Sequence, residues 1–316
     1  MTDVDWSRMG WHSWSDLGEV RARLAAGADP NTLVRGRGRP LHHAAREGSA
    51  EVVAELARLV DDVDAVEDGR TALWLAVNED KPDNARALVA AGADPHRQMM
   101  AGWTPARLSL AGSTPDLFDT GATLTPQEAA AVAEARRLTD ALAEIDGDGM
   151  SLCCVADVDS TEAVRRLDAT IIDEEIDVED LWDGLDDDSI LTLGITDVPG
   201  GCVVSQPWAY GASMPLVPLL LSAGTVCYGM YANPKSGNQG ESVHDGVITG
   251  SDLHPGGGWC AADAPSAEVL RTFLYRDRAI EYCCAYAGVR PADARPFTEP
   301  DRWLRLPARN WWAVSH

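Results

Sequence analysis

Internal repetition constrains this chain more than any other feature of its sequence. Three similar stretches begin at residues 39 (RPLHHAA), 71 (TALWLA) and 104 (TPARL), and these starts are 32 and 33 residues apart. A second apolar-periodic stretch follows each of the first two, at about 50–60 and 84–91. The phrase GADPN at 27–31 nearly matches GADPH at 92–96. A fixed period of this length predicts a solenoid of stacked helix pairs.

These phrases resemble the ankyrin repeat, whose unit is a turn followed by two antiparallel helices. The resemblance covers about residues 6–118. The glycine of each GADP phrase suits a helix end, since it adopts a left-handed conformation without strain. Aspartate and proline suit the turn that follows. The small side chains of Ala44, Ala45 and Ala76 would allow neighbouring helices to stack closely.

Some positions depart from the repeat pattern. The first unit keeps only its second helix and end phrase, and three tryptophans (Trp6, Trp11 and Trp14) precede it, which predicts an amino-terminal cap. Arg39 replaces the usual threonine and Trp74 the usual histidine. The third unit breaks off at residues 111–115, so another segment must cover the end of the stack.

The chain changes character after the repeats. Thr125, Pro126 and Glu128 form a capping-box pattern before an alanine-rich helix that runs to about residue 145, which we expect to cap the array. Beyond it, strands predicted near 151–157, 190–195, 201–205 and 225–231, and a hairpin at 243–248, alternate with short helices. We therefore predict a multidomain protein, an all-α repeat solenoid followed by an α+β domain with an antiparallel sheet. The predicted boundaries are 1–118, 119–146 and 147–316.

The second half resembles an uncharacterised actinobacterial domain family over about residues 150–291. Three stretches carry the likeness, at 153–167, at 225–248 and in the helix that ends with Gly288, Val289 and Arg290. The resemblance implies no known activity. An actinobacterial source also fits the basic residues, which are almost all arginine; only Lys81 and Lys235 are lysines.

Composition narrows the classes of function. The formal net charge of −24 argues against general binding to nucleic acid or anionic lipid. No run of eighteen apolar residues exists and the amino terminus is polar and acidic, so we expect a cytoplasmic protein without a membrane span. Seven cysteines without metal-site spacing predict reduced, mostly buried thiols.

The repeats predict a partner-binding face that is basic and aromatic, since ankyrin proteins generally bind with turn tips and first helices. Residues 1–118 carry 13 basic and 18 acidic side chains, against 13 and 32 in the remainder. The bland alternative is that the arginines solvate turns and the tryptophan packs between repeats. A third interpretation is that the face binds the acidic stretch of the chain's own second half. The predicted binding residues are Arg35, Arg37, Arg39, His43, Arg46, Arg70, Trp103 and Arg107.

An acidic tract at residues 173–188 is the second candidate for binding. Its carboxylates are interrupted by apolar residues, including Trp182, and its spacing is not that of a calcium loop. It is either a solvated loop or a docking strip for a basic partner with Trp182 as its apolar anchor. Bacterial immunity proteins that block basic nuclease toxins have this character.

A cluster of titratable residues motivates the alternative that the chain is an enzyme. Glu241, His244, Asp245, His254 and Cys260 could make a zinc site or a cysteine nucleophile with its base. The simpler interpretation is a hairpin tip at Asp245-Gly246 and a plain glycine loop. No cofactor and no metal is expected. We therefore predict a protein-binding adaptor or regulator, with an immunity or antitoxin role as a narrower version.

Overall fold

The structure, a computed structural model, describes residues 5–35, 38–119, 121–143, 145, 147–174, 176, 178 and 187–313. Its residues form two compact units. The first unit contains Met1–Ala130 together with Trp259–Leu274, and the second contains Ala131–Gly258 together with Tyr275–His316. These bounds differ from the predicted ones, because a segment expected in the last domain belongs to the repeat unit.

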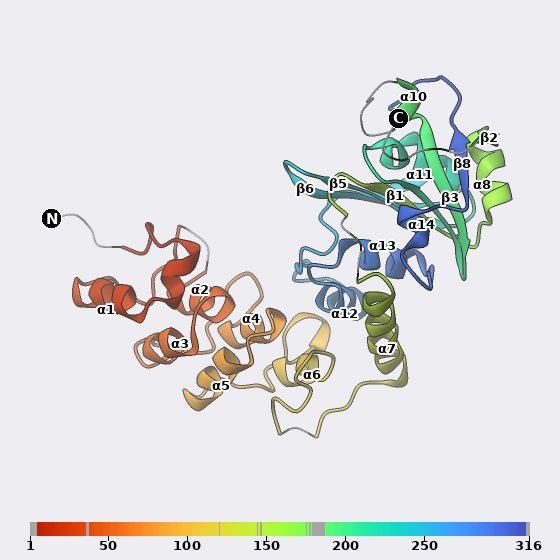
Figure 1. Cartoon of the computed structure of the whole chain (residues 1–316). Helices are drawn as coiled ribbons and strands as arrows, with labels where there is room; N and C mark the ends of the chain where they lie inside the picture. Colours follow the sequence, from red (N-terminus) through yellow and green to blue (C-terminus); the bar gives the residue numbers. More distant parts are fainter. Residues whose placement is uncertain are drawn as a thin grey trace. The chain divides into compact units, whose positions relative to one another are not determined.

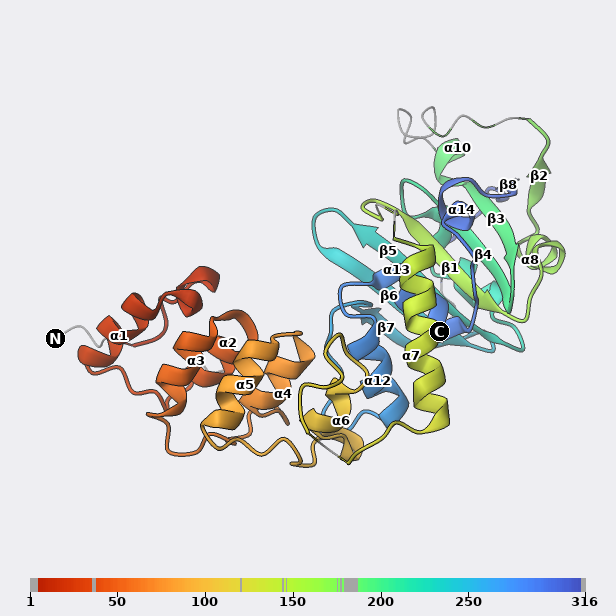
Figure 2. The same cartoon turned by 60° about the horizontal axis from the view of Figure 1, so that its bottom comes forward.

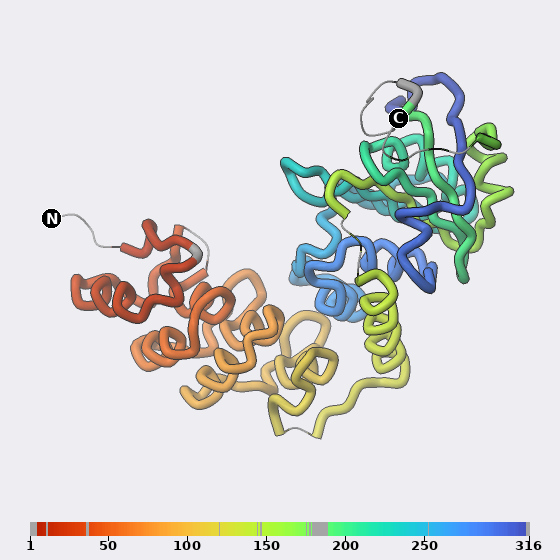
Figure 3. The backbone as a smooth tube through the Cα atoms, viewed as in Figure 1, coloured from red at the N-terminus to blue at the C-terminus, as the bar shows by residue number. Residues whose placement is uncertain are grey.

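Helix pairs build the first unit (Figure 1). Within the pairs, α2 contacts α3 and α4 contacts α5; between pairs, α2 contacts α4 and α3 contacts α5. Figure 3 follows the backbone through these successive pairs. This is the stacked arrangement that the repeat spacing predicts. The elements are η1 (Trp11–Ser15), α1 (Leu17–Ala25), α2 (Pro40–Glu47), α3 (Ala50–Ala57), α4 (Ala72–Asn78), α5 (Pro82–Ala90), η2 (Met100–Gly102) and α6 (Pro105–Ser109).

The residues singled out in the repeats have the expected structural roles. Ala44, Ala45 and Ala76 are fully buried where the helices stack. Gly27 and Gly92 follow α1 and α5 with φ angles of 98° and 100°, the left-handed conformation that glycine adopts without a steric penalty. The end phrases therefore terminate helices, as predicted.

Aromatic residues pack at the amino-terminal end of the repeats. The rings of Trp6 and Trp14 are buried and stacked, with centroids 5.8 Å apart. Trp14 also stacks on His43 of α2 at 5.3 Å. The Trp6 indole N–H donates to the Asp29 carbonyl at 2.8 Å. These contacts join the tryptophans to the first helices, and their role as a cap stays a prediction.

The segment that packs against the third unit comes from late in the sequence. Helix α12 (Ser266–Leu274) contacts η2, and the fully buried Trp103 donates its indole N–H to Ser266 Oγ at 2.9 Å. A Cβ on Gly112 would lie 3.2 Å from the Phe273 ring. Of α7 (Pro126–Ala141), the helix expected to cap the array, only the residues up to Ala130 belong to this unit.

An antiparallel sheet of eight strands forms the centre of the second unit (Figure 2). The strand order is β2-β8-β3-β4-β1-β5-β6-β7, and every adjacent pair is antiparallel. The α+β prediction is confirmed. The strands are β1 (Ser151–Ala156), β2 (Thr170–Ile172), β3 (Thr192–Val198), β4 (Gly201–Gln206), β5 (Val226–Asn233), β6 (Gly237–His244), β7 (Val247–Leu253) and β8 (Arg302–Arg305).

Helices cover both faces of this sheet. Alternate residues of β1, such as Cys153, share a core with α8 (Ser160–Leu167) and α11 (Leu216–Leu221). On the other face, Cys154 lies 3.9 Å, sulfur to sulfur, from Cys284 of α13 (Ala279–Ala287). Helix α14 (Arg295–Thr298) contacts β3 and β4. The remaining short helices are α10 (Asp187–Ile190) and η3 (Gly211–Ser213).

The cysteines are mostly buried, as predicted. Six of the seven lie in the core of the second unit, and Cys260 in the first unit is half-buried. Strands β2 and β8 were not predicted. They are three and four residues long and lie together at one side of the sheet, where β8 also pairs with β3.

Candidate functional sites

A cavity of about 770 Å³ lies in the first unit, beside helix α2 of the repeats. We call it the inner groove. Its walls come from the amino-terminal cap, from α2 and the turns around it, and from Trp259, which follows β7 in sequence. It is lined by Met9, Gly10, Trp14, Val34, Arg35, Gly38, His42, His43, Arg46, Glu47, Glu67, Asp68, Arg70, Leu75 and Trp259.

Arg70 is the most buried cation of the inner groove, at 6% exposure. Its guanidinium donates to two carbonyl oxygens, that of Asp68 at 2.8 Å and that of Cys260. No carboxylate of the described residues lies within ion-pair distance of it. Burial lowers the pKa of Arg70, because removing a guanidinium from water disfavours its charged form.

Two guanidinium groups lie close to the ring of Trp259. The Arg70 carbon Cζ is 4.2 Å from the centroid of the indole ring, and the Arg46 Cζ is 5.1 Å from it. Both distances fall within the range of a cation–π contact. The ring remains 44% exposed, so part of it faces the solvent.

His42 lies at the base of the inner groove. Its Nε2 is 3.1 Å from the Ala65 carbonyl and 3.3 Å from the Arg70 carbonyl, so Nε2 carries the proton and donates. Nδ1 is buried and has no hydrogen-bond partner among the described residues. Burial lowers the pKa of His42. Because Arg39 replaces threonine three residues earlier, no hydroxyl is available from that position.

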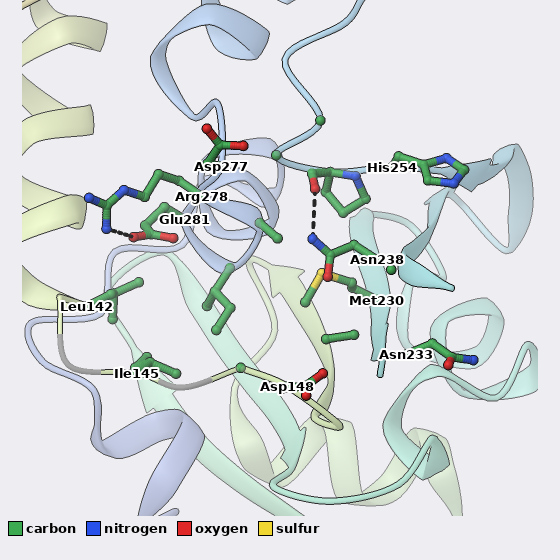
Figure 4. A pocket seen from close by; sticks show the side chains of 18 of the residues that line it. Leu142, Ile145, Asp148, Met230, Asn233, Asn238, His254, Asp277, Arg278 and Glu281 are labelled. Carbon is green, nitrogen blue, oxygen red and sulfur yellow. Dashed lines mark hydrogen bonds and ion pairs between the residues drawn. The ribbon is translucent and has the colours of Figure 1, made fainter. Parts of the chain in front are cut away.

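A second cavity, of about 590 Å³, lies in the sheet unit between β5, β6 and the start of α13 (Figure 4). Glu281 is 5% exposed, and burial raises its pKa. Its carboxylate forms an ion pair with Arg278 at 3.7 Å. The Asn238 amide donates to the Pro255 carbonyl at 3.2 Å. The cavity has both polar and apolar walls, and its buried carboxylate already has a cation nearby.

Comparison with protein families assigns the repeats. Residues 15–99 match the family model of ankyrin repeats in three copies. These residues are ankyrin repeats. The match includes the shortened first unit and ends before the stretch that starts at Thr104. No curated protein matches the chain.

Most of the residues predicted to bind a partner line the inner groove or pair with a residue that lines it. Arg35, His43, Arg46 and Arg70 line the inner groove. Arg39 pairs with Glu67, which lines the groove too, with Nε 2.8 Å from Oε1. Whether these residues bind a partner stays a prediction.

Two further predicted residues are engaged within the ankyrin unit itself. Trp103 has no exposed surface, and the Arg107 guanidinium lies 4.3 Å from its ring. Arg107 also donates to both carboxylate oxygens of Glu128, at 2.6 and 2.7 Å. Arg37 and Trp182 lie outside the described residues.

Trp259 was not predicted as a groove residue. It follows the glycine loop of the second half, far in sequence from the ankyrin repeats, and no motif surrounds it. A tryptophan directly after a run of glycines was the available signal. A tryptophan is large and rarely left in solvent without a packing or binding role.

The predicted histidine and cysteine cluster does not come together as a metal site. Among the described residues no group of three or more His, Cys, Asp or Glu side chains is placed to hold an ion. His244 ends β6, and its Nε2 lies 3.3 Å from Tyr286 Oη. His254 lines the second cavity. Cys260 belongs to the ankyrin unit, and burial raises the pKa of its thiol, which opposes formation of the reactive thiolate.

The acidic tract at 173–188 falls largely outside the described residues, which include only 173, 174, 176, 178, 187 and 188 of it. Its predicted role therefore stays a prediction. In the part of the chain that the structure describes, no helix is both long and apolar enough to cross a membrane.

Proposed function

We propose that this protein binds another protein through the inner groove of its ankyrin repeats. Ankyrin repeats support protein–protein binding in general. The observation that carries the proposal is the groove of about 770 Å³, which is as large as a small-molecule pocket and can therefore take side chains of a partner. Arginine and tryptophan, the side chains that most often anchor interfaces, line it together.

The same arginine and tryptophan side chains support a narrower role as an adaptor or regulator, because they are suited to hold a partner protein. The immunity or antitoxin role depends on the acidic tract and stays a prediction. So do the cytoplasmic location and the actinobacterial origin of the second unit.

Affinity capture with a matched pair of variants tests the proposal. The groove variant combines Arg35→Glu with Arg46→Gln. The control is Arg86→Glu on α5, which is 55% exposed and paired with Asp83 outside the groove. We expect one protein from an extract of the source organism to be retained by the wild type and the control but lost from the groove variant. Identical captured proteins for all three would refute a role for the groove.

A further inference from the structure

The arrangement of charge in the inner groove indicates what chemistry its partner presents. This inference rests on the proposed function and deepens it. Arg70 is held in place by two carbonyl oxygens, neither of which carries a formal charge. A buried cation without a direct ion pair is unfavourable, since it has lost water and the nearby Asp68 charge compensates it only from beyond ion-pair distance.

A second cation stands beside the first. Arg46 approaches the same Trp259 ring from 5.1 Å, so two guanidinium groups share one aromatic ring. Arg46 has ion pairs of 3.5 Å to Glu79 and 3.9 Å to Glu47, which are longer than an ordinary N–H···O hydrogen bond. Its donors are therefore not fully used by the contacts within the protein.

We propose that Arg46, Arg70 and Trp259 form a subsite that takes a carboxylate from an acidic peptide segment of the partner protein. A carboxylate at this position would accept hydrogen bonds from Arg46 and compensate the charge of Arg70. Guanidinium–carboxylate hydrogen bonds are among the strongest that side chains make, which gives such a contact both affinity and direction.

The other residues that line the inner groove favour a peptide over a ligand with several phosphates. Glu47, Glu67 and Asp68 also line the groove, and they would repel a chain of phosphates, which carries several negative charges, more strongly than a single carboxylate. The groove lining also includes the apolar side chains of Val34 and Leu75. The fitting ligand is thus an aspartate or glutamate next to an aliphatic or aromatic residue.

A random heptapeptide library selected on the full-length protein tests this chemistry. We expect an enriched motif with an acidic residue beside an apolar one. The peptide made from that motif should bind about tenfold more weakly to the Arg46→Gln variant, because one partner of a charged pair is lost. Arg86→Gln should bind it as the wild type does. Replacing the acidic residue of the peptide by its amide should also weaken binding about tenfold.

A second variant tests the role of the buried Arg70. Arg70→Lys keeps the charge but loses the planar group that faces Trp259, and we expect weaker binding with an unchanged circular dichroism spectrum. A library motif without a carboxylate, or equal binding of the acidic and amide peptides, would overturn the inference. If the groove variant still loses its captured protein in that case, the proposed function stands and only the carboxylate subsite fails.

Discussion

The residue that precedes the first helix of each repeat is fixed by different interactions in different repeats. Thr71 and Thr104 accept hydrogen bonds from the backbone N–H groups of Trp74 and Arg107, at 3.1 and 3.0 Å. Arg39, at the matching position before α2, makes no such capping bond and pairs with Glu67 instead. The repeats thus use two different ways of fixing the same turn.

These differences predict an order of stability losses. Thr71→Ala should lower the free energy of unfolding by about 1–2 kcal/mol, because it removes a helix cap. Arg39→Ala should cost less, about 0–1 kcal/mol, since it removes a partly exposed ion pair. Urea unfolding followed by circular dichroism measures both. A larger loss for Arg39→Ala than for Thr71→Ala would contradict this account of the caps.

The buried His42 side chain predicts that the stability of the folded protein depends on pH. Its pKa in the folded protein is below the ordinary value of 6.5 because burial disfavours the cation. Below pH 6.5 the unfolded chain therefore binds a proton that the folded chain does not, and stability falls as the pH is lowered through that value. Urea unfolding at pH 7.5 and 5.5 should show a larger drop for the wild type than for His42→Gln. An equal drop would mean that His42 does not contribute.

At the level of elements, hairpin turns followed from sequence better than short strands did. Asp245 and Gly246 have φ angles of 46° and 73° between β6 and β7, as their sequence predicts. The first half of β6 was missed because it is polar and glycine-rich. Gly240 is needed there, since a Cβ would lie 2.7 Å from Tyr228 Oη on the adjacent strand. Strand β8 was missed because its pairing partners are distant in sequence.

The β3–β4 hairpin has a strict requirement for glycine. Gly201 has a φ of 150°, and a Cβ there would lie 1.9 Å from the Val155 carbonyl oxygen. Gly201→Ala should therefore destabilise the protein by about 2–3 kcal/mol, since β1 and β4 would have to separate. Gly224→Ala is the control, because φ is 69° but no atom lies within 4 Å, and about 1 kcal/mol is expected. Similar thermal denaturation midpoints for both variants would contradict the steric argument.

At the scale of the whole molecule, the repeats could be predicted from sequence. That residues 259–274 belong to the same unit as the repeats could not be predicted. The prediction of ankyrin helices depended on local motifs repeated at a fixed spacing. The contacts of Trp259 and Ser266 with that unit depend on long-range packing, for which neither residue has a sequence signature. Binding of the basic face to the acidic stretch of the chain's own second half stays a prediction, because that stretch lies largely outside the described residues.

This arrangement predicts complementation between fragments. A fragment of residues 1–130 should bind a synthetic peptide of residues 258–275, because the peptide supplies the partners of Arg70 and Trp103. Isothermal titration calorimetry and an increase in the melting temperature of the fragment measure this binding. A peptide carrying Trp259→Ala should bind more weakly, and a scrambled peptide serves as control. Equal heats for native and scrambled peptides would argue against specific docking.

The discontinuity of the ankyrin unit also has a consequence for synthesis on the ribosome. The 144 residues from 131 to 274 are made after the repeats and before the unit is complete. At ordinary bacterial elongation rates this takes about 7–30 seconds. During that interval the nascent repeats have emerged while Trp103 lacks the segment that covers it. The order of translation thus gives chaperones, or a partner protein, access to this surface before α12 exists.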